Sequence, residues 1–221
     1  MEVLVPERLD ASTVRSLDAA LQGGIESGEP VALRGGDPFC SGLALDSVDA
    51  GADLRGFARL LHRLRTAPVP SVALVEGSCL AGGLGLAAAC DVVLATRRAR
   101  FGLSEALLGL VPATIWPLLQ ERVAPQRLRL LALRGSSLDA HAALGLGLVD
   151  RIVEEPERAL RQELRALRRA APRSVAWLKA APDLLAALQD GADRTALCLA
   201  DPAVRQAAAR LAAGEPAWSR S

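Results

Sequence analysis

Residues 72–95 contain the pattern that most restricts the fold of this chain: a buried strand, a glycine-rich turn, an apolar helix and another strand. The strands are expected at Val72–Val75 and Val92–Ala95, and the helix at about Gly83–Ala89. The first strand does not alternate polar and apolar residues, which is typical of a parallel sheet that is covered on both faces. Earlier segments repeat the rhythm, with strands expected at Val3–Val5 and Pro30–Leu33 and helices at 9–21 and Leu54–Leu64. This succession predicts an α/β fold with crossover connections.

The last part of the chain has a different pattern. Helical periodicity is found in three segments, Glu157–Ala170, Ser174–Gln189 and Ala203–Ala213. Pro182 lies where it would split the second of them. We therefore divide the chain into an α/β core, residues 1–155, and a helical region, residues 156–221. Such a region either packs on a neighbouring subunit or covers a site, and periodicity does not decide between the two.

Charge and composition argue against several classes of function. The 26 basic and 25 acidic residues nearly balance, aromatic residues make up 3%, and tyrosine is absent, so no nucleic-acid surface is expected. The longest uncharged apolar run, Leu80–Cys90, is shorter than the ~20 residues that span a bilayer. No signal peptide is recognisable, and four cysteines without a CxxC pair predict reduced thiols in the cytoplasm. Two histidines and no Cys/His cluster predict no metal site.

Two glycine-containing segments are the candidates for a catalytic role. Phe39–Ala44 follows an expected strand, and Glu76–Leu86 joins a strand to the apolar helix. Neither is specific alone, because the first could be a connecting loop and helix–strand packing could explain the glycines of the second. The second segment also lacks the lysine of a P-loop and the spacing of a dinucleotide-binding turn. Together, two such turns can each direct one backbone N–H at a single oxygen, which forms an oxyanion hole for a thioester that becomes an enolate.

Four ordered motifs make the sequence similar to the crotonase superfamily of enoyl-CoA hydratases and isomerases. They are Phe39–Gly42, Pro70–Asp91, Phe101–Pro112 and Ala140–Asp150, and the resemblance covers nearly the whole chain. It implies an α/β, crotonase-type spiral of ββα-like turns with a helical C-terminal trimerisation region. It also implies a homotrimer, or a hexamer made of two trimers.

The resemblance further implies roles for single residues in the two turns. The backbone N–H groups of Leu43 and Gly82 would form the oxyanion hole. Gly42, Ala81 and Gly83 would lie against the substrate.

Glu105 matches the position of a catalytic glutamate in this superfamily. Once the enolate is stabilised, one carboxylate can remove or return the proton at C2. Leu103, Leu107 and Leu108 are expected to surround it and to raise its pKa. The alternative is a glutamate at a helix start that favours the helix dipole or forms a salt bridge. The first glutamate of two-glutamate hydratases is replaced here by Gly85, so water addition by the usual route is not expected.

Residues 103–119 resemble a narrower group, the dehydratases of β-branching cassettes in polyketide biosynthesis. Such enzymes convert 3-hydroxy-3-methylglutaryl groups on an acyl carrier protein to 3-methylglutaconyl thioesters. They use no cofactor apart from the phosphopantetheine or CoA that carries the acyl group. The alternatives are an enoyl-CoA hydratase or isomerase acting on a CoA thioester, a decarboxylase of the same superfamily, and a catalytically silent scaffold. The absence of tyrosine and the position of Lys179, the only lysine, disfavour decarboxylation.

The sequence leaves the roles of several residues undecided. Trp116 either lines the acyl pocket or packs in the core or at an interface. His62 or Asp46 could assist the proposed catalytic carboxylate, although His62 and His141 are both expected at the surface.

Cys40 and Cys79 flank the two glycine turns and are expected to be packing groups rather than nucleophiles. Four arginines lie on one predicted helix and either meet an acidic carrier protein or form a solvated face: Arg161, Arg165, Arg168 and Arg169.

Overall fold

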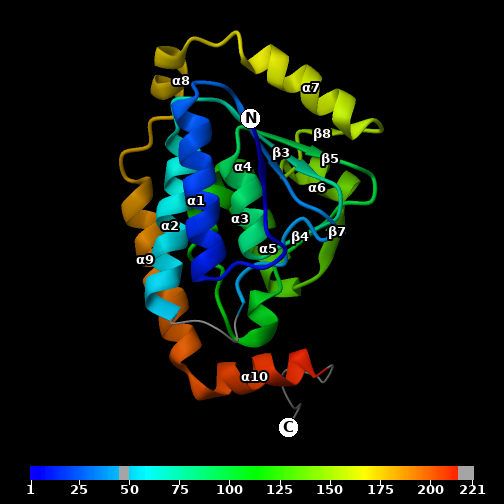
Figure 1. Cartoon of the computed structure of the whole chain (residues 1–221). Coiled ribbons are helices and arrows are strands. Elements are labelled where there is room, and N and C mark those ends of the chain that lie inside the picture. Colours follow the sequence, from blue (N-terminus) through cyan, green and yellow to red (C-terminus); the bar gives the residue numbers. More distant parts are fainter. Residues whose placement is uncertain (45–49, 214–221) are drawn as a thin grey trace.

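A five-stranded parallel sheet forms the centre of the computed structural model, which describes residues 1–44 and 50–213 (Figure 1). The strands lie in the order β1-β2-β3-β5-β8, and each pairs in parallel with its neighbours. They are β1 (Glu2–Leu4), β2 (Val31–Arg34), β3 (Ser71–Val75), β5 (Val92–Ala95) and β8 (Arg151–Ile152). Parallel neighbours require crossover connections, so the predicted α/β class is confirmed.

Helices cover both faces of this sheet. They are α1 (Ala11–Glu26), α2 (Ala50–Thr66) and α3 (Gly82–Ala89) on one face and α7 (Pro156–Leu167) on the other. In β3, Ala73 and Val75 belong to the core under the first three helices, whereas Val72 and Leu74 pack with Leu160 of α7. Because both faces of β3 are buried, its sequence does not alternate between polar and apolar residues.

A second sheet begins where the sequence predicts only a glycine-rich turn. β4 (Ser78–Leu80) pairs in parallel with β6 (Arg100–Gly102), which pairs antiparallel with β7 (Ser137–Asp139). Helix α6 (Ala140–Leu146) begins after Asp139, whose carboxylate accepts a hydrogen bond from the N–H of Ala142 at 2.8 Å and caps the helix.

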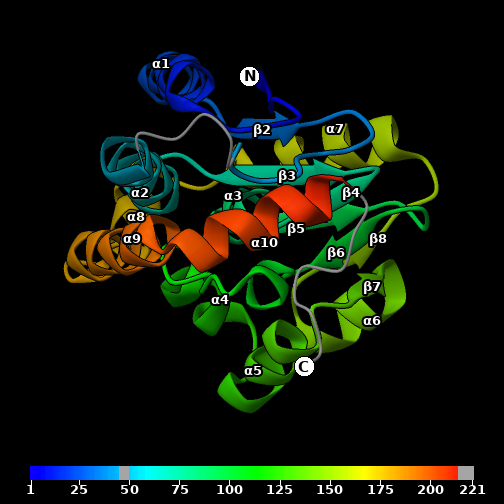
Figure 2. The ribbon, with the colours of Figure 1, turned by 90° about the horizontal axis from the view of Figure 1, so that it is seen from below.

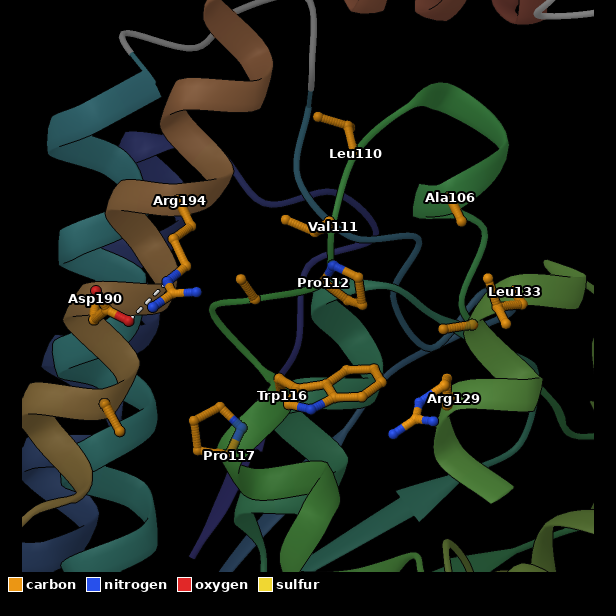
Figure 3. A pocket seen from close by; sticks show the side chains of 14 residues that line it. Ala106, Leu110, Val111, Pro112, Trp116, Pro117, Arg129, Leu133, Asp190 and Arg194 are labelled. Carbon is orange, nitrogen blue, oxygen red and sulfur yellow. Dashed lines mark hydrogen bonds and ion pairs between the residues drawn. The ribbon is translucent and has the colours of Figure 1, made fainter. Parts of the chain in front are cut away.

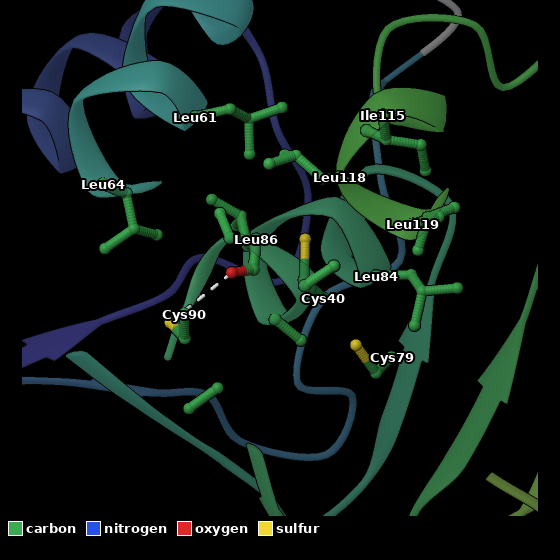
Figure 4. Packing of buried hydrophobic residues seen from close by; sticks show 14 of the residues in the cluster. Cys40, Leu61, Leu64, Cys79, Leu84, Leu86, Cys90, Ile115, Leu118 and Leu119 are labelled. Atoms are coloured by element: carbon green, nitrogen blue, oxygen red, sulfur yellow. Dashed lines mark hydrogen bonds between the residues drawn. The ribbon is translucent and has the colours of Figure 1, made fainter. Parts of the chain in front are cut away.

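The apolar helix α3 is buried along its whole length. After β6 the chain forms the 3-10 helix η1 (Glu105–Leu108) and the helices α4 (Trp116–Arg122) and α5 (Pro125–Arg134). Leu86 of α3 packs in one cluster with Leu61 of α2 and Leu118 of α4 (Figure 4). Because α3 contacts apolar side chains on all sides, its position relative to the two sheets is fixed.

The C-terminal region consists of α8 (Pro172–Leu178), α9 (Leu184–Ala200) and α10 (Pro202–Ala212). Pro182 lies between α8 and α9, at the predicted break. Helix α9 lies along α2, and α10 crosses the end of the fold opposite α7 (Figures 1 and 2). The helical region therefore covers the core of its own chain. None of the helices described is both long and apolar enough to cross a membrane.

Lys179, the C-cap of α8, attaches this region to the sheet. Its buried ammonium group donates to Asp91 Oδ2 at 2.8 Å, to the carbonyl of Val69 at 3.1 Å and to Ser71 Oγ at 3.4 Å. Asp91 also accepts from the N–H of Ser71 at 2.7 Å. The single lysine thus has a structural role in the fold.

Candidate active site

The fold brings the two glycine turns into contact. Cys40 and Cys79 face each other in an isolated β-bridge, and the N–H of Leu80 donates to the carbonyl of Cys40 at 2.9 Å. A Cβ atom on Gly42 would lie 2.8 Å from Ala81 Cβ, and φ at Gly42 is +95°. Glycine is therefore required here both by the backbone conformation and by the approach of the second turn.

The second turn is strained at Ala81, which caps α3 at φ 49° and ψ −120°. A residue other than glycine in such a conformation costs about 1–3 kcal/mol and persists only where the surroundings hold it. The N–H of Ala81 donates to the carbonyl of Gly102 at 3.0 Å, which ties the turn to β6. A Cβ atom on Gly83 would lie 2.5 Å from the carbonyl oxygen of Cys40, so the first turn of α3 is in direct contact with the glycine turn that contains Cys40.

The N–H groups of Leu43 and Gly82 are unpaired within the described part of the chain. Neighbouring amides are engaged, since Ala44 donates to the carbonyl of Leu9 and Leu84 donates to that of Ala81. Gly82 is the first residue of α3, where helix N–H groups have no partner within the helix and favour negative charge. Both residues line one cavity together with Glu105.

This cavity has a volume of about 180 Å³. Its wall is mostly apolar, and Glu105 is the only ionisable residue among the described residues that line it. The lining consists of Ser41, Leu43, Leu54, Phe57, Ala81, Gly82, Ser104, Glu105, Leu108, Leu110, Val111, Pro112, Thr114, Ile115, Thr195 and Leu199. We refer to it as the Glu105 cavity.

Glu105 begins η1, and Leu103 and Ser104 connect it to the end of β6. Its Oε2 atom is buried without a hydrogen-bond partner among the described residues. Loss of hydration raises the pKa of Glu105 to about 7, although hydrogen bonds from the backbone N–H groups of Glu105 and Ser104 oppose the rise. Of the predicted apolar neighbours, Leu108 lines the cavity, whereas Leu103 is buried outside its lining and Leu107 is exposed. The carboxyl group is therefore suited to exchange a proton near neutral pH.

The space beside Gly85, the position of the missing first glutamate, is filled. A Cβ atom on Gly85 would lie only 2.3 Å from Cγ2 of Ile115, which also lines the Glu105 cavity and packs near α3 (Figure 4). An apolar side chain thus occupies the place into which a carboxylate at position 85 would project. The sequence showed the absent glutamate but not the residue that replaces its volume.

Thr114 and Thr195 contribute hydroxyl groups to the cavity that the sequence did not predict. Thr195 lies on α9, and its Oγ1 is 3.3 Å from Oγ1 of Thr114. Thr195 also donates toward the carbonyl of Gly191 at 3.0 Å. Gly191 could have given a signal, because a glycine inside a helix indicates close packing, but the predicted helix ended at Gln189, whereas α9 continues to Ala200.

Three of the residues predicted for substrate binding do not line the Glu105 cavity. Gly42 and Gly83 are buried and do not line the Glu105 cavity. Trp116 lines a neighbouring cavity of about 500 Å³ between α4, α5 and α9 (Figure 3). The two cavities share Leu110, Val111 and Pro112 as a common wall.

The histidines lie away from Glu105. His62 is half-buried rather than exposed, lines a separate cavity with Arg59 and Arg63, and has its pKa lowered by burial and by Arg63. His141 is exposed, as expected, and lies 3.3 Å from the guanidinium group of Arg97. Asp46 lies outside the described residues.

The thiols of Cys40 and Cys79 are buried, and burial raises both pKa values, that of Cys40 to about 11. Thiols held in the protonated form pack as small apolar groups, in line with the prediction. No group of three or more His, Cys, Asp or Glu residues in the described segments could hold a metal ion.

The four arginines of the predicted helix are exposed and lie on α7 or just after its end at Leu167, and α7 packs on the sheet face opposite α1, α2 and α3 (Figure 1). Arg168 pairs with Glu29 at 2.6 Å. This placement gives no direct route from these arginines to the Glu105 cavity.

The two sheets, the buried α3 and the paired glycine turns define a crotonase fold. The chain belongs to the enoyl-CoA hydratase/isomerase family, whose sequence profile matches residues 11–214. It superposes with a TM-score of 0.87 on the crystal structure of a provisionally named enoyl-CoA hydratase from Mycobacterium avium paratuberculosis K-10, at 25% identity, over 99% of this chain and 93% of the other.

Two curated relatives align with shorter regions. A provisionally named enoyl-CoA hydratase of Thermus thermophilus is 38% identical over 130 residues, or 59% of this chain and 51% of the relative. The bacillaene synthase dehydratase PksH of Bacillus subtilis is 35% identical over 120 residues, or 54% of this chain and 46% of the relative. The match thus spans about half the length of these two relatives.

Proposed function

We propose that this protein removes water from a 3-hydroxyacyl thioester, with 3-hydroxy-3-methylglutaryl carrier protein as the substrate and 3-methylglutaconyl carrier protein as the product. The observation that carries the proposal is the carboxyl group of Glu105, whose buried Oε2 atom has no partner among the described residues, in a cavity that it shares with the free N–H groups of Leu43 and Gly82. The resemblance of residues 103–119 to β-branching dehydratases and the similarity to PksH support the choice of substrate.

In the proposed mechanism, the thioester oxygen accepts hydrogen bonds from the N–H groups of Leu43 and Gly82. Glu105 in its ionised form removes a proton from C2, and the oxyanion hole stabilises the resulting enolate. The protonated Glu105 then donates that proton to the 3-hydroxyl group, the C3–O bond breaks, and the enolate electrons form the C2=C3 double bond. One water leaves, and Glu105 returns to its ionised form. Each oxyanion donor is expected to contribute about 3–4 kcal/mol to transition-state stabilisation.

The pKa of about 7 suits both halves of this mechanism, because the carboxyl group must first accept and then donate a proton near neutral pH. Addition of water by two carboxylates is disfavoured, since Ile115 fills the space beside Gly85.

The second candidate is an enoyl-CoA isomerase or hydratase acting on a CoA thioester. The names of other relatives favour it, including the Thermus thermophilus relative. A single carboxylate could also move a proton between two carbons of an enoyl thioester, so the same site supports isomerisation.

Mass spectrometry of carrier-protein-bound substrate tests the proposal. Incubation with 3-hydroxy-3-methylglutaryl carrier protein should yield a product lighter by one water, and Glu105→Gln should abolish this product. Glu155→Gln is the matched control, because Glu155 is exposed and forms a surface ion pair with Arg158. Conversion of enoyl-CoA thioesters with no water loss from the carrier-protein substrate would select the second candidate. A fully active Glu105→Gln variant would overturn both.

We also propose that the protein assembles as a trimer or as a hexamer of two trimers. Large apolar side chains that are exposed on α5, α8 and α9 support this: Leu133, Trp177, Leu178 and Leu197 are each 68–79% exposed. Size-exclusion chromatography with light scattering should give a trimeric or hexameric mass. A monomer at micromolar concentration would contradict the proposal.

A further inference from the structure

The hydroxyl groups of Thr114 and Thr195 form a buried polar pair in the wall of the Glu105 cavity. The residues are only 4% and 8% exposed. They come from the segment before α4 and from α9, whereas Glu105 comes from η1. Ser41 and Ser104 also line the cavity, but both are only half-buried. Among the described residues, the threonine pair is therefore the most enclosed hydroxyl site that a ligand at Glu105 could reach.

The pair is positioned by direct packing of α9 on the segment before α4. A Cβ atom on Gly191 would lie 2.2 Å from the carbonyl oxygen of Ala113 and 2.8 Å from the backbone nitrogen of Thr114. Only glycine permits this approach, and Thr195 follows one helical turn later on the same face of α9. Its hydroxyl then lies 3.2 Å from the carbonyl of Val111. Both threonines are thus held by main-chain groups.

The two threonine hydroxyl groups have only two hydrogen atoms to donate, which leaves lone pairs on one hydroxyl oxygen without a donor. Thr195 has one hydroxyl hydrogen and two carbonyls in reach, those of Gly191 and Val111. When Thr195 donates to either carbonyl, the hydroxyl of Thr114 donates to Thr195 Oγ1. Oγ1 of Thr114 then has lone pairs that accept from no described residue. A buried acceptor of this kind favours a ligand that brings its own donor.

We propose that Thr114, oriented by Thr195, accepts a hydrogen bond from the 3-hydroxyl group of the acyl thioester and selects hydroxylated over deoxy acyl groups. This inference rests on the proposed function. The 3-hydroxyl hydrogen bonds to Thr114, which leaves a lone pair of the same oxygen for the proton that Glu105 delivers. The C3–O bond breaks and the hydroxyl group departs as water, while the enolate electrons form the C2=C3 bond. Thr114 is a positioning residue for the leaving group and does not transfer a proton.

The test compares the affinity of two ligands that differ only in the hydroxyl group. The probes are the 3-hydroxy-3-methylglutaryl and 3-methylglutaryl thioesters of pantetheine, bound to the full chain with Glu105→Gln so that no turnover occurs. The hydroxylated probe should bind roughly threefold to tenfold more tightly, the range expected of one hydrogen bond between neutral groups. Thr114→Val should remove this preference and leave the affinity for the deoxy probe unchanged. Thr114→Ser should retain the preference.

Thr66→Val is the matched control. Like Thr195, Thr66 donates to the carbonyl one turn earlier, that of His62 at 2.8 Å, but it lines a different cavity, so its replacement removes a threonine hydroxyl away from Glu105. A folded Thr114→Val variant that keeps the full preference would overturn the inference, as would equal affinity of both probes for the Glu105→Gln parent. The water-loss assay on the wild-type chain reports separately on the proposed function. A hydroxyl preference that depends on Thr114 without any water loss would leave this inference standing and reject the dehydratase.

Discussion

Replacement of Glu105 by glutamine should change how stability depends on pH. Burial raises the pKa of Glu105 from 4.5 to about 7, so between these values the folded state holds a proton that the unfolded state has lost. The wild-type free energy of unfolding should therefore fall as pH rises through this interval. At about 1.4 kcal/mol for each pH unit, the change amounts to about 3 kcal/mol. Glutamine does not titrate, so Glu105→Gln should lack this component.

Urea denaturation of both proteins at several pH values between 4 and 8.5 measures the effect. The other titrating groups are common to both chains, so the difference between wild type and variant isolates Glu105. Relative to the variant, the wild type should lose about 3 kcal/mol between pH 4.5 and pH 7 and change little above pH 8. The same titration should appear in kcat/KM, which should rise with pH until the carboxyl group is ionised. A stability difference that is constant across this range would show that the carboxyl group is hydrated and would refute the reasoning from burial.

Three further substitutions test the packing around the site. Gly85→Glu should destabilise the fold by about 1–3 kcal/mol without creating hydratase activity, because the new side chain meets Ile115. Urea denaturation would measure the stability, and an enoyl-thioester hydration assay would measure the activity. The double variant Gly85→Glu with Ile115→Ala should recover part of the stability. Lys179→Met should cost about 3 kcal/mol in urea denaturation, because it leaves a partly buried carboxylate without its cation. Gly191→Ala should cost about 1–3 kcal/mol and reduce turnover by displacing α9, whereas Gly23→Ala, where an added methyl group meets no described atom within 4 Å, should be neutral or stabilising by up to about 1 kcal/mol. Equal stability of the two alanine variants would contradict the close contact at α9.

The central sheet could be predicted from the sequence because its strands are buried on both faces. Val72–Val75 and Val92–Ala95 are short apolar runs, and the observed strands agree with them within one residue. The apolar segment of α3 was recognisable for the same reason, since no face of that helix meets solvent. Local composition was sufficient to predict these elements, because nearly every residue in a fully buried element is apolar or small.

The second sheet left no such signal. Arg100–Gly102 and Ser137–Asp139 are short, contain polar residues or glycine, and gain their strand conformation only by pairing with each other and with β4. Family resemblance placed Glu105 near the glycine turns, but the buried Oε2 atom without a partner among the described residues is a property of the assembled cavity. Likewise, a glycine at position 85 does not reveal which side chain fills the adjacent space.

Residues 110–115 contain the two features by which this cavity differs from an active site with two carboxylates. Ile115 fills the volume beside Gly85, and Thr114, the preceding residue, lines the same cavity with its hydroxyl group paired to Thr195. Helix α9 fixes both, because Gly191 contacts the backbone of this segment and Thr195 hydrogen bonds to Thr114. Loss of a carboxylate at position 85 therefore removes the group that would hold a nucleophilic water, while the hydroxyl pair supplies an acceptor for a hydroxyl that leaves. The proposed route, in which the single carboxyl group of Glu105 both removes and returns the proton, follows from this exchange of polar groups in the wall of one small cavity.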